Sequence, residues 1–172
     1  MQRFQETEAP LEVALVEPEI PPNTGNVART CAAVLTPLHL VEPLGFRLTD
    51  RHLKRAGLDY WPYVQVILHR SLQHFLRYME GRRLLFFSKK GSVDYDRFAY
   101  EPGDCLVFGS ETRGLPAWLL EAHADRVLKI PMESSYVRSL NLSTAVGIAL
   151  FEARRQLRRQ SAVSRAQAVI PL

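Results

Sequence analysis

The sequence predicts an α/β fold in which helices cover both faces of a mostly parallel sheet. Short apolar runs alternate with segments of helical period along its 172 residues, which is typical of parallel strands joined by helices. With 47% hydrophobic residues, the chain can bury one sizeable core but is short for two domains. We therefore expect a single domain over residues 11–160, with an N-terminal tail at 1–10 and a C-terminal tail at 161–172.

Each element is expected from its apolar pattern. The expected strands are Leu11–Val16, Leu38–Glu42, Val64–Leu68, Leu84–Ser88, Cys105–Phe108 and Val127–Ile130. The expected helices are Thr24–Leu35, Asp50–Ala56, Leu72–Met79, Ala117–Glu121 and Leu142–Arg158. Asn23 or Thr24 is expected to cap the first helix after a turn at Pro22, and Ser139 or Asn141 is expected to cap the last.

Several classes of protein are disfavoured by composition. The apolar runs are shorter than the roughly 18 residues that cross a bilayer, and residues 1–10 lack the apolar stretch of a secretory signal, so we expect a cytoplasmic protein that does not bind membranes. Cys31 and Cys105 lie in apolar segments, where buried reduced thiols are expected. Their number and spacing indicate neither a disulfide framework nor a zinc site, and no metal is expected.

The positive charge gathers at the end of the chain. The formal net charge is +4, and residues 134–172 hold six arginines against one acidic residue. Arg154 and Arg158 stand four residues apart on the last expected helix, as do Arg155 and Arg159, so each pair repels unless an anion lies across it. RNA would supply that anion. The alternative is a solvated helix end whose cations suit the helix dipole.

Polar loops follow several of the expected strands. They are "EPEIPPNTGNVART" after the first, "SKKGS" after the fourth, "GSETRGLP" after the fifth and "PMESSYVRSLNLSTAV" after the sixth. Open α/β sheets bind ligands beyond the carboxyl ends of their strands, so the last three loops are expected to converge on one pocket. Asn26 and Arg29 share one face of the first helix, which helix capping does not explain.

The glycines of these loops allow a ligand to approach main-chain groups closely, although Gly109 and Gly114 could also serve only as turn residues. The sequence has neither GxxxxGK[ST] nor a GxGxxG between strand and helix, which disfavours a nucleoside triphosphate or a dinucleotide. A Ser-His-Asp hydrolase is disfavoured too, because GxSxG is absent and none of the five histidines lies in a glycine-bearing loop.

Three segments in this order resemble the motifs of a known family. "EPEIPPNTGNVART", "GSETRGLP" and "IPMESSYVRSLNLSTAVGIALFEARRQL" closely resemble the three motifs of the SPOUT methyltransferases. The resemblance is to the minimal TrmL (YibK) branch, the tRNA 2'-O-methyltransferases that act on the wobble cytidine or uridine at position 34, and "LKRAGLDYW" also resembles that branch. It covers about residues 11–160.

This resemblance implies a C-terminal trefoil knot, which is a rare exception to the topology of most folds. It also implies S-adenosylmethionine as the cofactor, a homodimer, and the tRNA anticodon stem-loop as the partner. The cofactor residues that it implies are Phe87, Gly109, Gly114, Ile130, Ser139 and Leu140. The implied catalytic residues are Arg29, Asn26, Glu111, Asn141 and Ser143, and the candidate RNA-binding residues are Arg138, Arg154, Arg155 and Arg158.

The resemblance leaves the role of one residue and the identity of the substrate open. Arg29 matches an arginine proposed as the general base in ribose-methylating relatives, but a guanidinium with a pKa above about 12 is a poor proton acceptor. We therefore expect Arg29 to clamp a phosphate and orient the 2'-hydroxyl. Ribosomal RNA as the substrate, or a non-catalytic dimer that binds S-adenosylmethionine and RNA, are the alternatives.

Overall fold

The computed structural model describes residues 11–48 and 63–168, and its core is a seven-stranded sheet of order β3-β2-β1-β6-β4-β7-β5. Every strand pairing in this sheet is parallel, which confirms the predicted class. The strands are β1 (Glu12–Val16), β2 (Leu38–Val41), β3 (Val66–His69), β4 (Leu84–Phe87), β5 (Val93–Asp94), β6 (Cys105–Phe108) and β7 (Val127–Lys129).

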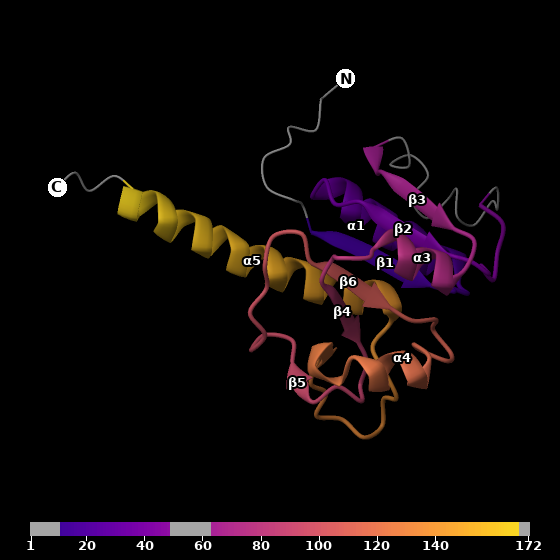
Figure 1. The fold of residues 1–172 in the computed structure, drawn as a ribbon. Helices are drawn as coiled ribbons and strands as arrows, with labels where there is room; N and C mark the ends of the chain where they lie inside the picture. The colour runs from indigo at the N-terminus through magenta and orange to yellow at the C-terminus, as the bar shows by residue number, and fades with distance from the viewer. Residues whose placement is uncertain (1–10, 49–62, 169–172) are drawn as a thin grey trace.

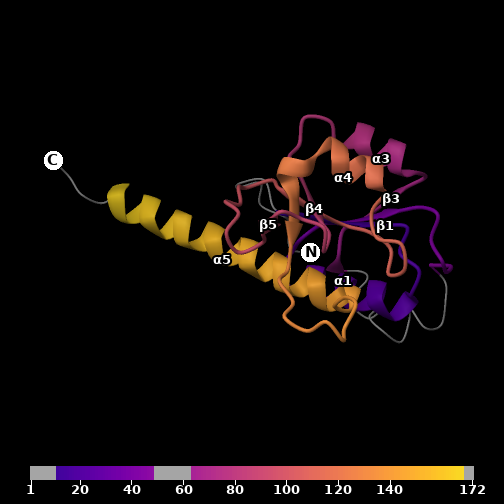
Figure 2. The ribbon, with the colours of Figure 1, turned by 90° about the horizontal axis from the view of Figure 1, so that it is seen from below.

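Helices cover both faces of the sheet. The α-helices are α1 (Pro21–Ala33), α3 (Leu72–Tyr78), α4 (Ala117–Ala122) and α5 (Leu142–Ala168), and Ala124–Arg126 forms a 3-10 turn. Figures 1 and 2 show α1 and α5 together on one face and α3 and α4 on the other. No helix of the described segments is long and apolar enough to cross a membrane.

Successive side chains of each strand point to opposite faces of the sheet, so the core has two layers. Val13 and Leu15 of β1 pack towards α1 and α5, whereas Ala14 and Val16 pack towards α3 and α4. A strand buried on both faces needs the continuous apolar runs that the sequence carries. Cys31 is buried, and burial raises the pKa of its thiol to about 12, which agrees with the predicted inert thiol.

Several element boundaries differ from the predicted ones. The first helix begins at Pro21 instead of Thr24, because a proline in the first turn lacks only an N–H that has no partner in the helix. The last helix continues past Arg158 to Ala168, so the expected tail 161–172 is helical over its first part. Strand β5 was not predicted, and β3 begins two positions later than expected. The expected helix Asp50–Ala56 and the segment "LKRAGLDYW" lie outside the described residues.

The path of the chain through the sheet is unusual. Strand β7 lies between β4 and β5, although residues 88–92 join those two strands directly. The chain therefore passes between two strands that an earlier loop connects before it reaches α5. Threading of this kind is what a trefoil knot requires.

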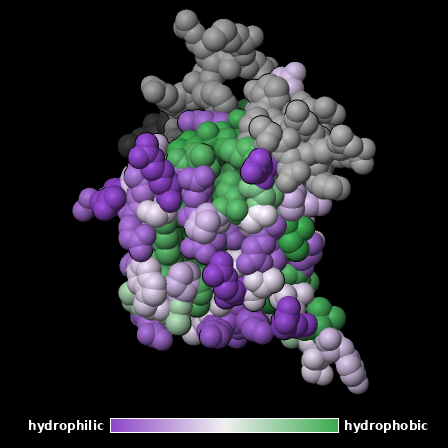
Figure 3. Space-filling model, turned by 90° about the vertical axis from the view of Figure 1, so that its right-hand side faces the viewer, coloured by the Kyte–Doolittle hydropathy of each residue, from purple (hydrophilic) through white to green (hydrophobic). Residues whose placement is uncertain are grey.

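The edge of the sheet at β3 carries apolar surface. Leu68 of this strand is 44% exposed. In Figure 3, which views the molecule from the right of Figure 1, apolar surface gathers in the upper part of a face that is otherwise largely polar. In the sheet, β3 and β5 are the two opposite edge strands.

A chain of buried polar groups links β1, β2 and β3. His39 Nε2 lies 2.8 Å from Glu12 Oε2, and His39 Nδ1 lies 2.8 Å from His69 Nε2. Exposed His74 continues the chain to the surface, with its Nδ1 3.3 Å from His69 Nδ1. Burial, followed by His39 and His74, lowers the pKa of His69 to about 4. Burial alone would raise the pKa of Glu12, but His39 and Arg82 outweigh it and lower that pKa.

We expect the free energy of unfolding to fall as the pH drops from about 6.5 to about 4, because unfolded His69 binds a proton at a higher pH than folded His69. Below about pH 4.5 the loss of the Glu12 carboxylate adds to this fall. Because the protein relaxes around the charged ring, we expect protonation of His69 to lower the free energy of unfolding by only about 1–2 kcal/mol. Urea denaturation at several pH values, compared between wild type and His69→Gln, measures it. If the free energy of unfolding fell with pH equally in the two proteins, the assignment to His69 would be contradicted.

Candidate functional site

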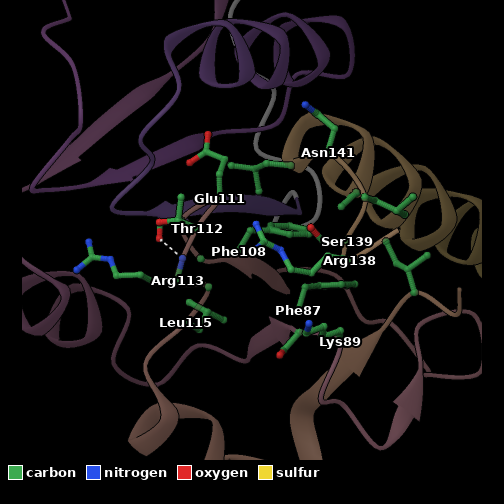
Figure 4. A pocket seen from close by; sticks show the side chains of 18 of the residues that line it. Phe87, Lys89, Phe108, Glu111, Thr112, Arg113, Leu115, Arg138, Ser139 and Asn141 are labelled. Carbon is green, nitrogen blue, oxygen red and sulfur yellow. Dashed lines mark hydrogen bonds between the residues drawn. The ribbon is translucent and has the colours of Figure 1, made fainter. Parts of the chain in front are cut away.

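A cavity of about 480 Å³ opens where the carboxyl ends of β4, β6 and β7 meet the start of α5 (Figure 4). Its floor is apolar: the rings of Phe87 and Phe108 stack with their centroids 4.6 Å apart, and Leu128 lies beside them. Its walls are the loops that follow these three strands. This confirms the predicted convergence, and the volume falls within the roughly 300–1,000 Å³ of small-molecule sites.

The loop after β6 depends on two glycines. A Cβ on Gly109 would lie 2.0 Å from the carbonyl carbon of Gly114 and 2.2 Å from the backbone nitrogen of Leu115. Gly114 has a φ of +68°, and its N–H donates to the Ser110 carbonyl at 2.9 Å. Gly109 is therefore required by close backbone packing and Gly114 by its left-handed conformation. Both glycines line the cavity, so the tight turn of this loop forms part of its wall.

A hydrogen-bond network joins the three motifs. The Glu111 carboxylate accepts from the backbone N–H of Glu19 at 2.8 Å and of Ile20 at 3.2 Å, and from Asn23 Nδ2 at 3.0 Å. Asn141 Nδ2 donates to Asn23 Oδ1 at 2.8 Å. Asn23 is thus the bridge between the loop after β6 and the start of α5.

Asn141 caps the last helix. Its Oδ1 accepts from the N–H of Ser143 at 2.9 Å, from Ser143 Oγ at 2.7 Å and from the N–H of Thr144 at 3.4 Å. This confirms one of the two predicted caps. At the first helix the predicted local cap is wrong: the N-cap is Ile20, no side chain of its own segment caps it, and Glu111 satisfies the free N–H groups instead.

A second set of contacts holds the tip of the same loop. Arg113 Nη2 lies 3.0 Å from Glu17 Oε2, and its Nε lies 3.7 Å from Glu19 Oε1. Thr112 Oγ1 lies 2.8 Å from the Glu19 carboxylate. These contacts, with the network of Glu111, fasten the loop to the segment between β1 and α1.

The rim of the cavity is positively charged. Lys89 and Lys90 come from the loop after β4, and Arg138 comes from the loop before α5 (Figure 4). None of the three is in an ion pair within residues 11–48 and 63–168. An apolar floor suits a flat ring system, and unpaired cations at the rim suit the phosphates of a nucleic acid.

The structure brings most of the expected site residues together. Those that line the cavity are Phe87, Gly109, Glu111, Gly114, Ile130, Arg138, Ser139, Leu140 and Asn141. Ser143 lies in the first turn of α5, bound to Asn141. Asn26 and Arg29 lie on the exposed face of α1 and do not line the cavity.

The arginines of α5 lie apart from Arg138. Arg154, Arg155 and Arg158 line a second cavity, of about 680 Å³, with the end of α1. Arg154 Nη1 donates to the Val34 carbonyl at 3.2 Å, and Arg155 forms two 2.7 Å hydrogen bonds with the Glu152 carboxylate. The repulsion expected along this helix is therefore partly relieved within the chain.

Sequence reasoning missed the part that Asn23 plays in the first cavity. The sequence predicts a helix cap at Asn23 or Thr24, and nothing in the sequence context of Asn23 indicates contacts with Glu111 and Asn141. Lys89 and Lys90 lie in "SKKGS", one of the loops expected at the pocket, and two adjacent cations in such a loop are typical of anion binding. Within the described segments, no group of three histidines, cysteines or acidic residues is arranged to hold a metal ion.

Comparisons with known proteins agree with this architecture. The tRNA (cytidine(34)-2'-O)-methyltransferase of Escherichia coli K12 is 46% identical over 156 residues, covering 90% of this chain and 99% of that protein. A solved structure described as giving insight into 2-OH methylation of C/U34 on tRNA has a TM-score of 0.83 and 50% identity, covering 90% of this chain and 94% of its own.

A further solved structure holds a cofactor. An AdoMet-bound rRNA methyltransferase from Sinorhizobium meliloti has a TM-score of 0.79 and 30% identity, covering 88% of this chain and 58% of its own. The model of the SpoU rRNA methylase family matches residues 10–151. This match spans all the strands and the start of α5. The chain therefore belongs to the SpoU rRNA methylase family.

Proposed function

We propose that this protein transfers a methyl group from S-adenosylmethionine to the ribose 2'-hydroxyl of the wobble nucleotide of tRNA, cytidine or uridine at position 34. The observation that carries the proposal is the single cavity formed by the loops after β4, β6 and β7, with an apolar floor and a cationic rim. The names of the E. coli relative and of the C/U34 structure support this substrate.

The cavity fits S-adenosylmethionine. Its apolar floor of Phe87 and Phe108 suits an adenine ring, and the close backbone packing at Gly109 fixes the loop that forms one wall of the cavity. We assign cofactor binding to Phe87, Gly109, Gly114, Ile130, Ser139 and Leu140. The bound cofactor supplies an electrophilic methyl group on a sulfonium. Glu111 and Asn141 act as positioning residues, because their hydrogen bonds hold the loop after β6 and the start of α5.

The chain's part in the reaction is mainly orientation. Holding a hydroxyl in line with a methyl group and its leaving sulfur contributes up to roughly 7–11 kcal/mol in favourable cases. We assign the binding of the substrate phosphate and the orientation of the 2'-hydroxyl to Arg29, with Asn26, Asn141 and Ser143 completing the polar shell around the substrate. A guanidinium suits this role because it stays charged and presents a planar set of donors.

Arg29→Lys tests this role, because the charge stays while the planar fork is lost. We expect kcat/KM for tRNA to fall about 10- to 100-fold while affinity for S-adenosylmethionine is unchanged. Steady-state kinetics and calorimetry measure the two effects. Arg77→Lys, an exposed arginine on α3, is the matched control. Unchanged turnover in Arg29→Lys would rule out the fork as the essential feature.

The partners of this reaction are proposed with it. The tRNA anticodon stem-loop is the substrate, and the enzyme acts in the cytoplasm as a homodimer whose interface includes α5. Arg154, Arg155 and Arg158 contribute a basic surface for RNA beside the end of α1, with Arg138 at the cavity itself. The threading of β7 between β4 and β5 supports the trefoil knot that the resemblance implies.

Methyl transfer from labelled S-adenosylmethionine to RNA from cells that lack this gene tests the proposal. Label in tRNA alone is the expected result. Label in ribosomal RNA instead would show that the substrate is ribosomal RNA and that the chemistry is still methyl transfer. The name of the Sinorhizobium meliloti protein gives it such a substrate. Binding of S-adenosylmethionine with label in neither RNA would favour a non-catalytic binding dimer.

A further inference from the structure

One aromatic side chain beside the cavity has no role in the cofactor site. Tyr136 lies in the loop between β7 and α5, and it is 98% exposed. Ile130 and Met132 on one side of it in sequence, and Arg138 on the other, line the cavity. The ring therefore stands in the same short loop that forms one wall of the site.

The surroundings of this ring are polar. The loop reads "ESSYVRS", and its only large apolar neighbour in sequence is Val137, which is 52% exposed. The N–H of Tyr136 donates to Ser134 Oγ at 3.2 Å, which shapes the bend that carries the ring outward. A tyrosine ring at this exposure does not pack in the core, so it is available for contact with a molecule outside this chain.

The charges around the cavity indicate what that partner is. Lys89 and Lys90 also line the cavity, on a turn that is packed on β7: a Cβ on Gly91 would lie 2.7 Å from the Leu128 carbonyl carbon. That packing fixes the turn, and Arg138 adds a third cation. A fixed group of cations with an exposed aromatic ring beside it is the combination by which proteins hold single-stranded nucleic acid, phosphates on the cations and a base on the ring.

We propose that Tyr136 is a substrate-binding residue that stacks on an unpaired nucleobase of the RNA substrate, while Lys89 and Lys90 bind the adjoining phosphates. This proposal rests on the proposed function and goes beyond it by naming the groups that hold the base. The proposal includes the displacement of the target nucleotide from the stack of the anticodon loop as its 2'-hydroxyl approaches the cavity. A ring at the rim stabilises the base in that position, and it accepts cytidine and uridine alike because every base has a stacking face.

Steady-state kinetics on an anticodon stem-loop substrate test the proposal. Tyr136→Ala is expected to raise KM for the RNA about 10-fold or more, with kcat at saturating RNA within about twofold and unchanged affinity for S-adenosylmethionine. Tyr136→Phe and Tyr136→Trp are expected to retain the wild-type KM, because the ring is kept. Tyr63→Ala, which removes a 68% exposed tyrosine near the opposite edge of the sheet, is the matched control.

The salt dependence of binding separates the ring from the lysines. Lys89→Ala and Lys90→Ala are each expected to reduce the slope of log K against log salt by about 0.7, the value for one phosphate of a single strand. Tyr136→Ala is expected to weaken binding without changing that slope, because stacking releases no counterion.

Two results would overturn the stacking role while leaving the proposed function standing. A KM in Tyr136→Ala equal to that of wild type, with wild-type methylation of the stem-loop intact, would remove the stacking role and leave the proposed function standing. A changed sedimentation coefficient in Tyr136→Ala at unchanged RNA affinity would assign the ring to a contact between subunits. Failure of the wild-type protein to methylate any RNA would instead defeat the proposed function, and the stacking role with it.

Discussion

Gly109→Ala is expected to reduce methyl transfer by about 100-fold or more, because displacement of a loop by about 1 Å costs that much in catalysis. The new Cβ would overlap the backbone of Gly114 and Leu115 at 2.0–2.2 Å, and backbone atoms cannot move aside as a flexible side chain can. The loop after β6 must therefore shift at the cofactor site. We also expect the free energy of unfolding to fall by about 1–3 kcal/mol, the usual cost of overpacking.

Gly147→Ala is the matched control for this prediction. Gly147 lies in α5, and a Cβ there meets no atom within 4 Å. Alanine in a helix is expected to stabilise the protein by about 0.5–1 kcal/mol at unchanged activity. Calorimetric titration with S-adenosylmethionine and a methyl-transfer assay on both variants give the comparison. Wild-type affinity in Gly109→Ala would contradict the assignment of this loop to the cofactor.

Glu111→Ala is expected to lower both stability and activity. Its carboxylate accepts from two backbone N–H groups at the start of α1 and from Asn23, so its removal leaves these donors without partners. Charge-assisted hydrogen bonds of this kind contribute about 1.5–3 kcal/mol each, and we expect a total loss of about 2–4 kcal/mol. Since the loop after β6 is then released, kcat/KM should also fall, by about 100-fold.

The double variant Glu111→Ala with Asn141→Ala distinguishes positioning from direct chemistry. Both side chains bind Asn23, so their effects on stability are expected to be non-additive by about 0.5 kcal/mol or more. Glu121→Ala, on the exposed side of α4, is the control for loss of a carboxylate. Fully additive effects, or a loss of turnover in Glu111→Ala at unchanged stability, would instead favour a direct catalytic role for Glu111.

The predictable part of the fold was the part that local pattern determines. Runs such as Cys105–Phe108 are apolar on both faces, which only a strand covered on both sides requires, and the structure buries all four of these residues. Strand β5, with two residues, is too short to carry any period. The start of α1 depends on Glu111, whose bond to the Glu19 N–H spans 92 positions of sequence, so no local signal could reveal that cap.

The candidate site also has a part that the sequence predicts and a part that it does not. The convergence of the loops at Phe87, Gly109 and Ile130 followed from a general rule about the carboxyl ends of parallel strands. The bridge through Asn23 could not be predicted, because it exists only once three separate loops have met. The exposure of Tyr136 could not be predicted either, because it depends on the path of the loop between β7 and α5 and not on a local pattern.

The most direct test of the central claim uses two anticodon stem-loops that differ by one oxygen atom. One carries cytidine at position 34 and the other 2'-deoxycytidine, and each is incubated with the protein and S-adenosylmethionine before nucleoside mass spectrometry. We expect 2'-O-methylcytidine from the first and no methylated product from the second. Methylation of the deoxy substrate, or of any other nucleotide in the first, would contradict the claim that this cavity directs a methyl group to the ribose of the wobble nucleotide.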